Sequence, residues 1–408
     1  MCFLIFCDIM IMLIGGFMEE KTKKKNSVSV FLFGVMLVFL AAVVVAIISS
    51  IIKQTDIATN NNMFTTPKQI APYLYEMSFT DYTVDTDHVT TNAMEAFGCS
   101  SVRNGNFYGR NFDYIFNDSP EFVVHMSATD KRHASVGVAA HFGLRESGME
   151  KGEYAKQLEL IPNFTLDGIN DAHVIASINV VPGNGDVEEL TGTNPEGEPL
   201  HAGYSVRYIL DNAGSADEAV ELLKTRNIYG SAVSGLYLHI MIADPEKTYV
   251  VEFINNELVA QEMTGDEQIM TNFYRNLPEL TEHSSGVERY QILKENYNEG
   301  DSLVGMRNLM ARVKYSNAYT FSNDPAWYSE AAPQSVINNK DSAEFAEYVR
   351  LFENLSKDYW NAITNDIRNP ANPKIWHTTH NSVYDIENQT LRLTVQEKYS
   401  DYFDFSLE

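Results

Sequence analysis

Four strand-like runs most constrain what this chain can fold into. Each is rich in β-branched and aromatic residues and is bounded by Gly, Pro, Asn or Asp, as is typical of β-strands. They are SVGVAAHFG (135–143), HVIASINVV (173–181), YLHIMIAD (237–244) and TYVVEFINNELVAQEM (248–263). Short intervals between such runs favour antiparallel pairing.

Helical segments lie between these groups of strands. They are YSVRYILDNA (204–213), GSADEAVELLKTRN (214–227) and RYQILKENY (289–297). In the second, Ser215 precedes Glu218 by three residues, which is the capping box that starts many helices. The pattern predicts an α+β fold built in layers on antiparallel sheets.

An uncharged apolar stretch, residues 26–52, precedes this region and is long enough to cross a bilayer. Four lysines between residues 21 and 25 precede it, so we expect residues 1–25 to be cytoplasmic and everything after Lys53 to lie outside. No A-x-A-like cleavage site is evident, which favours an uncleaved signal-anchor over a cleaved signal peptide and secretion. Translation from Met18 would shorten the tail.

The charge of the chain argues against nucleic-acid binding. It carries 30 basic and 55 acidic residues, a net charge of −25. A surface this negative repels phosphate backbones and anionic headgroups. Acidity that merely keeps an exported protein soluble is a sufficient alternative explanation.

Cysteine usage is the sharper indication of function. Cys2 and Cys7 lie in or before the apolar N-terminal stretches, so Cys99 has no disulfide partner in the part expected outside the cell. An unpaired cysteine in a strand is commonly a small buried hydrophobe. A nucleophilic or redox-sensing thiol is the alternative.

A β-hairpin is predicted directly after Cys99. Asn104-Gly105 is a strong turn signal, and with these two residues as the turn, Cys99 would face Arg110 across the strands. A guanidinium beside a thiol favours the nucleophilic thiolate. Strict alternation places Asp113 on the opposite face, so a bulge or the end of pairing after Asn111 is needed to bring it close.

The motifs along the chain resemble the choloylglycine hydrolase family of N-terminal-nucleophile amidases, which includes bile salt hydrolases and penicillin V acylases, with acid ceramidase-like relatives. The resembling segments appear in family order from Cys99 to about Leu393. They are Cys99 with Tyr108-Gly-Arg-Asn-Phe-Asp113, Leu166-Asp-Gly-Ile-Asn170, Ile178-Asn-Val-Val-Pro182, Leu238-His-Ile-Met-Ile-Ala-Asp244, Tyr249-Val-Val-Glu252, Met270-Thr-Asn272, Ser285-Gly-Val-Glu-Arg289, Ser382-Val-Tyr-Asp385 and Leu391-Arg-Leu393. The intervals from Cys99 to Arg110 and from Asn272 to Arg289 are shorter than in bile salt hydrolases and more like ceramidase-type and acyltransferase-type relatives.

The resemblance implies a fold and a division of the chain. The implied fold is a four-layer αββα sandwich with antiparallel sheets, preceded by one transmembrane helix. The expected organisation is a cytoplasmic tail or misassigned start (1–25), a transmembrane signal-anchor (26–52), a stalk or propeptide (53–98) and an amidase domain (99–408).

The resemblance also implies a mechanism, in which the chain cuts itself between Gly98 and Cys99. The free α-amine of Cys99 would then act as general base for its own thiol. The remaining roles implied are Asp113 to orient that amine, Arg110 to steady the thiolate, Asn179 and Asn272 to donate to the oxyanion, and Arg289 to support the nucleophile's surroundings.

The predicted activity is hydrolysis of a non-peptide linear amide in an acylated small molecule, such as a conjugated bile salt, penicillin V or an N-acyl amine. No cofactor, metal or nucleic-acid partner is expected, and the sequence leaves the oligomeric state open, a homo-oligomer included. The predicted location is membrane-anchored with the catalytic domain outside the cell, or secreted. The alternative is a non-catalytic, membrane-anchored binding module that retains the fold.

Overall fold

The computed structural model describes residues 63–71, 74–84, 99–115, 120–140, 151–182, 190–230, 236–277, 286–314, 376–395 and 397–407. The chain divides into two compact units, residues 1–61 and 62–408, and every described residue belongs to the second. The expected tail and signal-anchor therefore lie outside the described residues. Within the described ranges, no helix is both long and apolar enough to cross a membrane.

Two large sheets organise the described residues. The larger, nine-stranded sheet runs in the order β1 (Lys68–Ala71), β2 (Leu74–Phe79), β5 (Glu121–Met126), β6 (Ser135–Ala140), β7 (Thr165–Asn170), β8 (Ile175–Pro182), β11 (Leu236–Ala243), β12 (Thr248–Ile254) and β13 (Glu257–Glu262). The smaller, six-stranded sheet runs in the order β14 (Ile269–Met270), β3 (Ser100–Asn104), β4 (Phe107–Ile115), β15 (Trp376–Asp385), β16 (Thr390–Val395) and β17 (Tyr402–Ser406). In these two sheets, each described pairing is antiparallel apart from that of β2 with β5.

The remaining elements are short. A parallel pair joins β9 (Glu198–His201) and β10 (Arg226–Tyr229). The described α-helices are α3 (Lys151–Glu159), α4 (Ser205–Asn212), α5 (Ala216–Lys224), α6 (Val287–Glu295) and α7 (Leu303–Arg312). The 3₁₀ helices are η1 (Ile161–Phe164), η2 (Ala202–Tyr204), η3 (Gly265–Glu267) and η5 (Tyr297–Gly300).

The strand and helix predictions are confirmed within a few residues. The four strand-like runs form β6, β8, β11 and the β12–β13 hairpin, and the three helical segments form α4, α5 and α6. The Ser215 hydroxyl accepts a hydrogen bond from the Glu218 backbone N–H at 3.1 Å, as a capping box requires. The fold class, α+β with antiparallel sheets, is therefore confirmed.

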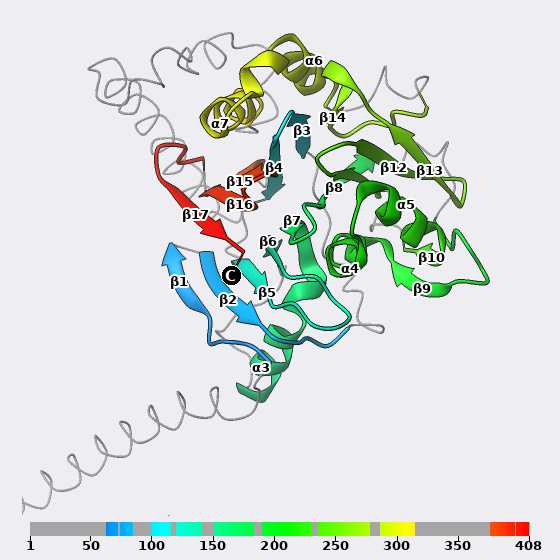
Figure 1. The fold of residues 1–408 in the computed structure, drawn as a ribbon, viewed down its shortest axis with the longest axis vertical. Coiled ribbons are helices and arrows are strands. Elements are labelled where there is room, and N and C mark those ends of the chain that lie inside the picture. The colour runs from blue at the N-terminus through cyan, green and yellow to red at the C-terminus, as the bar shows by residue number, and fades with distance from the viewer. Residues whose placement is uncertain are drawn as a thin grey trace, which may run out of the picture. The chain divides into compact units, whose positions relative to one another are not determined.

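The faces of β4 show how the layers stack. Tyr108 and Arg110 point at the nine-stranded sheet, where the Tyr108 hydroxyl lies 2.6 Å from Ser177 Oγ. Gly109, between them, points the other way, and a Cβ there would lie 2.7 Å from Met306 Sδ of α7. Helices α6 and α7 thus cover the outer face of the six-stranded sheet (Figure 1).

The same alternation holds for β7 of the nine-stranded sheet. Asp167 points at the six-stranded sheet, whereas a Cβ on Gly168 would lie 2.5 Å from Leu210 Cδ1 of α4. Helices α4 and α5 pack on this outer face (Figure 1). The described layers therefore run helices, sheet, sheet, helices, and a hydrophobic core fills each of the three spaces between them.

Part of the segment expected as a stalk or propeptide belongs to the nine-stranded sheet. Within residues 53–98, β1 and β2 form, and β2 pairs in parallel with β5. Leu74 packs into the core between the sheets, while Met77 and Phe79 pack on the other face. Burial on both faces is typical of a parallel strand inside a sheet.

Candidate active site

The hairpin after Cys99 forms, but its register differs from the prediction by two residues. Gly105 and Asn106 make the turn, so that Arg110 lies opposite Ser101 and not opposite Cys99. Gly105 has φ of +56°, and glycine at the first central position is characteristic of a type II′ turn. The prediction of an Asn104-Gly105 turn was wrong. A type I′ turn would place Gly105 at its second central position, whereas in the observed turn Gly105 takes the first central position and Asn106 the second.

Arg110 still approaches Cys99, because a shift of two residues preserves the face of a strand. Its Nη2 lies 3.9 Å from Cys99 Sγ and donates to the Ile178 carbonyl at 3.0 Å. Its Nη1 donates to Asp167 Oδ2 at 2.9 Å, and this buried ion pair holds the guanidinium in place. The predicted neighbourhood of cation and thiol is therefore present, as a diagonal pair.

The environment of the Cys99 thiol differs from the expectation in one respect. The residue is only 1% exposed, and burial raises the pKa of the thiol despite the opposing effects of Arg110 and of the Asp113 backbone N–H. Arg110 favours the thiolate, as predicted, but desolvation outweighs its effect. A buried, protonated thiol needs a base before it can act as a nucleophile.

One of the two arrangements expected to bring Asp113 close to Cys99 is present, namely the end of strand pairing after Asn111. Pairing of β3 with β4 ends at Ser100 opposite Asn111, two residues before Asp113. An irregularity also occurs near Asp113, but it lies in the neighbouring strand β15, between Thr378 and His380.

The carboxyl group of Asp113 is completely buried. Thr378 Oγ1 donates to its Oδ1 at 2.6 Å, and its Oδ2 lies 3.5 Å from Arg289 Nη1. Burial raises the pKa of Asp113 to about 7, although Arg289 and Thr378 act in the opposite direction. Asp113 can therefore change charge near neutral pH.

Arg289, at the start of α6, joins several parts of the candidate site. Its Nη1 donates to the Cys99 carbonyl at 2.7 Å and to Ser100 Oγ at 2.9 Å, and its Nη2 donates to Asn272 Oδ1. Gly286 directly precedes the helix as its N-cap residue, and its φ of +97° and close approach to the Asn272 backbone leave little room for a side chain.

Asn179 and Asn272 lie together where β8 passes the end of β14. The Asn179 amide donates to the Met270 carbonyl at 3.3 Å, and the Asn272 amide donates to the Val180 carbonyl at 2.6 Å. Each of these contacts uses one hydrogen of an NH₂ group that has two. One N–H of each amide therefore joins β8 to the residues around β14, and the other N–H can donate to a substrate.

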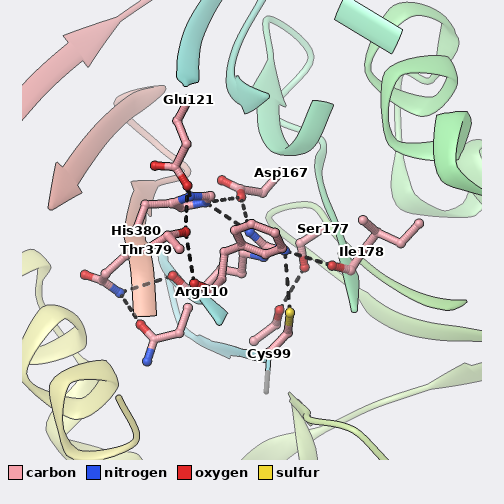
Figure 2. A network of polar contacts seen from close by, with 12 residues as sticks. Cys99, Arg110, Glu121, Asp167, Ser177, Ile178, Thr379 and His380 are labelled. Carbon is pink, nitrogen blue, oxygen red and sulfur yellow. Dashed lines mark hydrogen bonds and ion pairs between the residues drawn. The ribbon is translucent and has the colours of Figure 1, made fainter. Parts of the chain in front are cut away.

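Sequence reasoning missed a group of buried charged residues behind Arg110. Asp167 Oδ2 lies 3.1 Å from His380 Nε2, and His380 Nδ1 lies 2.9 Å from Glu121 Oε1. Figure 2 shows these side chains arranged from Glu121 through His380 and Arg110 to Cys99. Asp167 lies within a motif that carried the resemblance, whereas nothing in the local sequence distinguishes Glu121 or His380.

Burial and neighbouring charges act in opposite directions on the pKa values of this group. Both ring nitrogens of His380 face carboxylate oxygens, and its Nε2 also lies 3.0 Å from Arg110 Nη1. Burial alone would lower the pKa of His380, but Glu121 and Asp167 outweigh it and raise that pKa. Burial would likewise raise the pKa of Asp167, but Arg110 and His380 hold it at about 2. The buried charges of Arg110, Asp167, His380 and Glu121 then balance.

The structure thus brings the predicted residues Cys99, Arg110, Asp113, Asn179, Asn272 and Arg289 together from five separate segments of the chain. Across the part of the chain that the structure describes, no group of three or more His, Cys, Asp or Glu side chains is placed to hold a metal ion.

Solved structures similar to this chain include two forms of one enzyme and one acylase. A mutant conjugated bile acid hydrolase from Clostridium perfringens has a TM-score of 0.40 and 15% identity, with 76% of this chain and 92% of that chain covered. Another variant of that hydrolase has a TM-score of 0.38, 13% identity and the same coverage. Penicillin V acylase from Agrobacterium tumefaciens has a TM-score of 0.37 and 16% identity, with 76% of this chain and 86% of that chain covered.

These solved structures are a bile acid hydrolase and a penicillin V acylase, the two kinds of enzyme that the sequence motifs resemble. No protein-family model matches the chain, and no curated protein matches it.

Proposed function

We propose that the chain is a cysteine N-terminal-nucleophile hydrolase of the choloylglycine hydrolase type, acting on a non-peptide linear amide of an acylated small molecule. The observation that carries this proposal is the position of Cys99, directly before β3 and between two arginines. Arg110 is 3.9 Å from its thiol, and Arg289 donates to its carbonyl at 2.7 Å. The order of the four layers is the one that an N-terminal-nucleophile sandwich requires.

Self-cleavage would generate the active N-terminus. The Cys99 sulfur adds to the Gly98 carbonyl carbon, the carbon–nitrogen bond breaks, and the nitrogen leaves with a proton as the free amine of Cys99. Water then hydrolyses the resulting thioester, which yields a Gly98 carboxylate and restores the thiol. No oxidant, reductant or cofactor is consumed.

Turnover repeats this chemistry on a substrate. The α-amine, whose ordinary pKa is near 8, takes the thiol proton as sulfur attacks the amide carbonyl, and returns it to the leaving amine. Asp113, as a carboxylate, would orient the protonated amine. Water then releases the acyl group from the thioester.

The oxyanion of the tetrahedral intermediate needs donors that are already in place. Asn179 and Asn272 each have a second amide hydrogen beyond the one that holds the strands together. A well-placed donor of this kind contributes roughly 3 to 4 kcal/mol to catalysis. Arg289 orients the Asn272 amide by donating to its oxygen, which turns the NH₂ group away from Arg289.

The test combines intact mass with a substrate panel. We expect the intact mass to show a catalytic polypeptide that begins at Cys99, and we expect the protein to hydrolyse at least one of taurine- or glycine-conjugated bile salts, penicillin V, N-acylethanolamines and acyl-homoserine lactones. Cys99→Ala should abolish both self-cleavage and turnover, while Cys99→Ser tests the thiol separately.

Two outcomes would contradict the proposal. Turnover retained in Cys99→Ala would exclude Cys99 as the nucleophile. A folded, uncleaved chain that binds these ligands without hydrolysing any of them would instead identify the non-catalytic binding module.

A further inference from the structure

We propose that His239 and Glu252 are positioning residues for the reaction, because they hold the backbone on both sides of Asn272 and so place this oxyanion donor. Residues 271–276, which directly follow β14, are called here the Asn272 loop. The inference deepens the proposed function and depends on it for the role of Asn272. Both residues lie within motifs that carried the resemblance, which gave neither of them a role.

The Asn272 loop has no regular structure of its own. β14 ends at Met270, and residues 271–276 form neither strand nor helix. A catalytic donor has to stay within about 0.5 Å of its productive position, and an irregular loop provides this precision only when surrounding side chains fix it. The side chains that bind this loop are therefore candidates for a role in catalysis.

Three neighbouring strands present one row of polar side chains to the loop. In the nine-stranded sheet, His239 of β11 lies opposite Asn179 of β8 on one side and opposite Glu252 of β12 on the other. Directly opposed residues share one face of a sheet. Met241 and Val250 lie on the same face and pack into the core between the two sheets. The row therefore faces the six-stranded sheet, to which β14 belongs.

His239 binds the loop just before Asn272. Its Nε2 lies 2.7 Å from the Thr271 carbonyl oxygen, and because a carbonyl only accepts, this nitrogen carries a proton and donates. The Thr271 hydroxyl donates in turn to the Gly286 carbonyl at 2.9 Å, directly before α6. Thr271 is therefore fixed between the nine-stranded sheet and the start of α6.

Glu252 binds the loop just after Asn272. It accepts hydrogen bonds from the Arg275 backbone N–H at 2.6 Å and from the Asn276 backbone N–H at 2.9 Å. The Asn276 side-chain amide donates to the same carboxylate at 2.8 Å. The Arg275 guanidinium binds Glu267 instead, so Glu252 holds the loop through its backbone.

Packing alone does not explain this buried pair. His239 and Glu252 are 0% exposed, and an apolar pair would fill the same space at a lower cost in desolvation. Burial would raise the pKa of Glu252, but His239, whose Nδ1 lies 3.6 Å from Glu252 Oε1, and the donors of the loop outweigh it and lower that pKa. Glu252 therefore binds the loop as a carboxylate, the stronger acceptor.

The expected kinetic effect follows from when the oxyanion forms. Val180 and Arg289 orient the Asn272 amide, while His239 and Glu252 fix the backbone that carries it. The oxyanion appears only after sulfur has attacked, so a displaced donor weakens the transition state and not the bound substrate. Loss of either positioning residue should therefore lower kcat and leave KM nearly unchanged.

The first experiment compares two replacements of His239 in the full chain, with an amide that the natural chain hydrolyses. Gln can place its amide nitrogen near the position of Nε2 and keep the bond to Thr271, whereas Leu fills the space without a donor. We expect at least a tenfold lower kcat in His239→Leu, a KM changed by less than about twofold, and recovery of most of kcat in His239→Gln. Equal kcat in the two variants would overturn the inference.

A double-mutant cycle tests whether His239 acts through Asn272. Asn272→Ala removes the donor, so adding His239→Leu should lower kcat by less than about twofold further. A further loss as large as that of His239→Leu alone would show that His239 acts by another route, and would overturn the inference.

A matched carboxylate provides the control for Glu252. Asp244 is also buried and accepts from two consecutive backbone N–H groups, those of Glu246 and Lys247, both at 2.8 Å, but this turn carries no candidate site residue. Glu252→Gln turns one acceptor into a donor, and we expect at least a tenfold lower kcat. Asp244→Asn should leave kcat unchanged. Equal kcat in the two folded variants would contradict a role for Glu252.

Hydrogen exchange in peptides that cover residues 271–276 makes the test independent of turnover. Exchange should be at least tenfold faster in Glu252→Gln and in His239→Leu than in the natural chain, and unchanged in Asp244→Asn. Unchanged exchange in the first two variants would overturn the inference. Faster exchange in a natural chain background that hydrolyses no amide would support the hold on the loop and contradict the proposed function instead. The His239 variants decide the question where Glu252→Gln does not fold.

Discussion

At the residue scale, the site contains a buried charge network that a cysteine nucleophile does not itself require. Arg110 is held beside the Cys99 thiol by Asp167, and Asp167 in turn contacts His380, whose other nitrogen faces Glu121. The imidazolium supplies the second positive charge that makes two buried carboxylates tolerable. We interpret His380 as a positioning residue, because it acts on the thiol only through Asp167 and Arg110.

Replacing His380 with Gln tests this role. The amide keeps one donor and one acceptor but carries no charge, so Arg110 should lose its alignment and kcat should fall about 10- to 100-fold, the equivalent of about 1.5 to 3 kcal/mol for a charged hydrogen bond. The imidazolium form persists only below the raised pKa of His380, so activity that depends on it should decline as pH rises through that pKa. The variant should lack this decline.

His125→Gln is the matched control for that experiment. His125 also lies in the nine-stranded sheet beside a carboxylate, with its Nε2 3.4 Å from Glu76 Oε1, but it has no described contact with the Cys99 group. We expect unchanged kcat and an unchanged pH profile in this variant. Wild-type kinetics in His380→Gln would show that His380 only fills space.

Asp113 should make stability depend on pH. Its pKa of about 7 in the folded chain lies above its ordinary value of 3.8, so the folded state binds a proton that the unfolded state releases between these values. The free energy of unfolding should therefore fall as pH rises from about 4 to 7, by at most about 4 kcal/mol. Urea denaturation of Cys99→Ala, which keeps the uncut chain, measures this slope.

The double variant Cys99→Ala/Asp113→Asn provides the comparison. Its amide does not titrate, so the part of the slope due to Asp113 should vanish. An identical dependence of unfolding free energy on pH in the single and double variants would show that Asp113 does not titrate in this range. In the otherwise natural chain, Asp113→Asn should also abolish turnover, which a purely redox-sensing Cys99 would not predict.

At the scale of single elements, the start of α6 determines where Arg289 lies. Gly286 has φ of +97°, and a Cβ there would lie 2.9 Å from the Asn272 backbone nitrogen and 3.1 Å from Arg289 Nη2. Glycine is needed at this helix start for two reasons, a left-handed backbone and a close approach. A side chain at this position would meet both Asn272, a candidate oxyanion donor, and Arg289, which orients the Asn272 amide.

Gly286→Ala should therefore damage activity more than stability. The left-handed conformation costs about 1 to 2 kcal/mol for an alanine, and the displaced Asn272 and Arg289 should lower kcat at least tenfold. Gly265→Ala is the control, because Gly265 also has positive φ, of +57°, but a Cβ there would meet nothing within 4 Å. Equal kcat in the two variants would contradict a catalytic consequence of this close approach.

At the scale of the whole molecule, cleavage before Cys99 would leave residues 26–52 and strands β1 and β2 in one polypeptide. If the apolar stretch is a signal-anchor and β2 stays paired with β5, this polypeptide should keep the catalytic piece, which begins at Cys99, on the membrane. We expect both polypeptides in the membrane fraction after alkaline extraction. Deletion of residues 26–52 and replacement by a cleavable export signal should move both to the soluble fraction.

That fractionation distinguishes the alternatives for the N-terminus. Release of the C-terminal polypeptide alone would contradict retention, whereas release of both polypeptides from the natural chain would favour a cleaved signal and secretion. Detection of each polypeptide with its own tag, one after Lys53 and one at the C-terminus, separates these results.

The sequence by itself determined the local structure and the approximate composition of the site. Alternation of apolar residues specified strands such as β8 and β11, and the Ser215 capping box specified the start of α5, because these signals depend only on near neighbours. Even with a wrong register, strand periodicity placed Arg110 on the face of Cys99. The order of the motifs identified the six candidate residues before any distance was known.

Only the tertiary structure decided what surrounds those residues. Glu121, Asp167 and His380 come from three strands far apart in the chain, and their proximity follows from the stacking of the two sheets. The raised pKa of Cys99 depends on burial, which no local pattern encodes. The position of β2 in the sheet also depends on tertiary contacts, because its partner strand β5 follows Cys99 in the sequence.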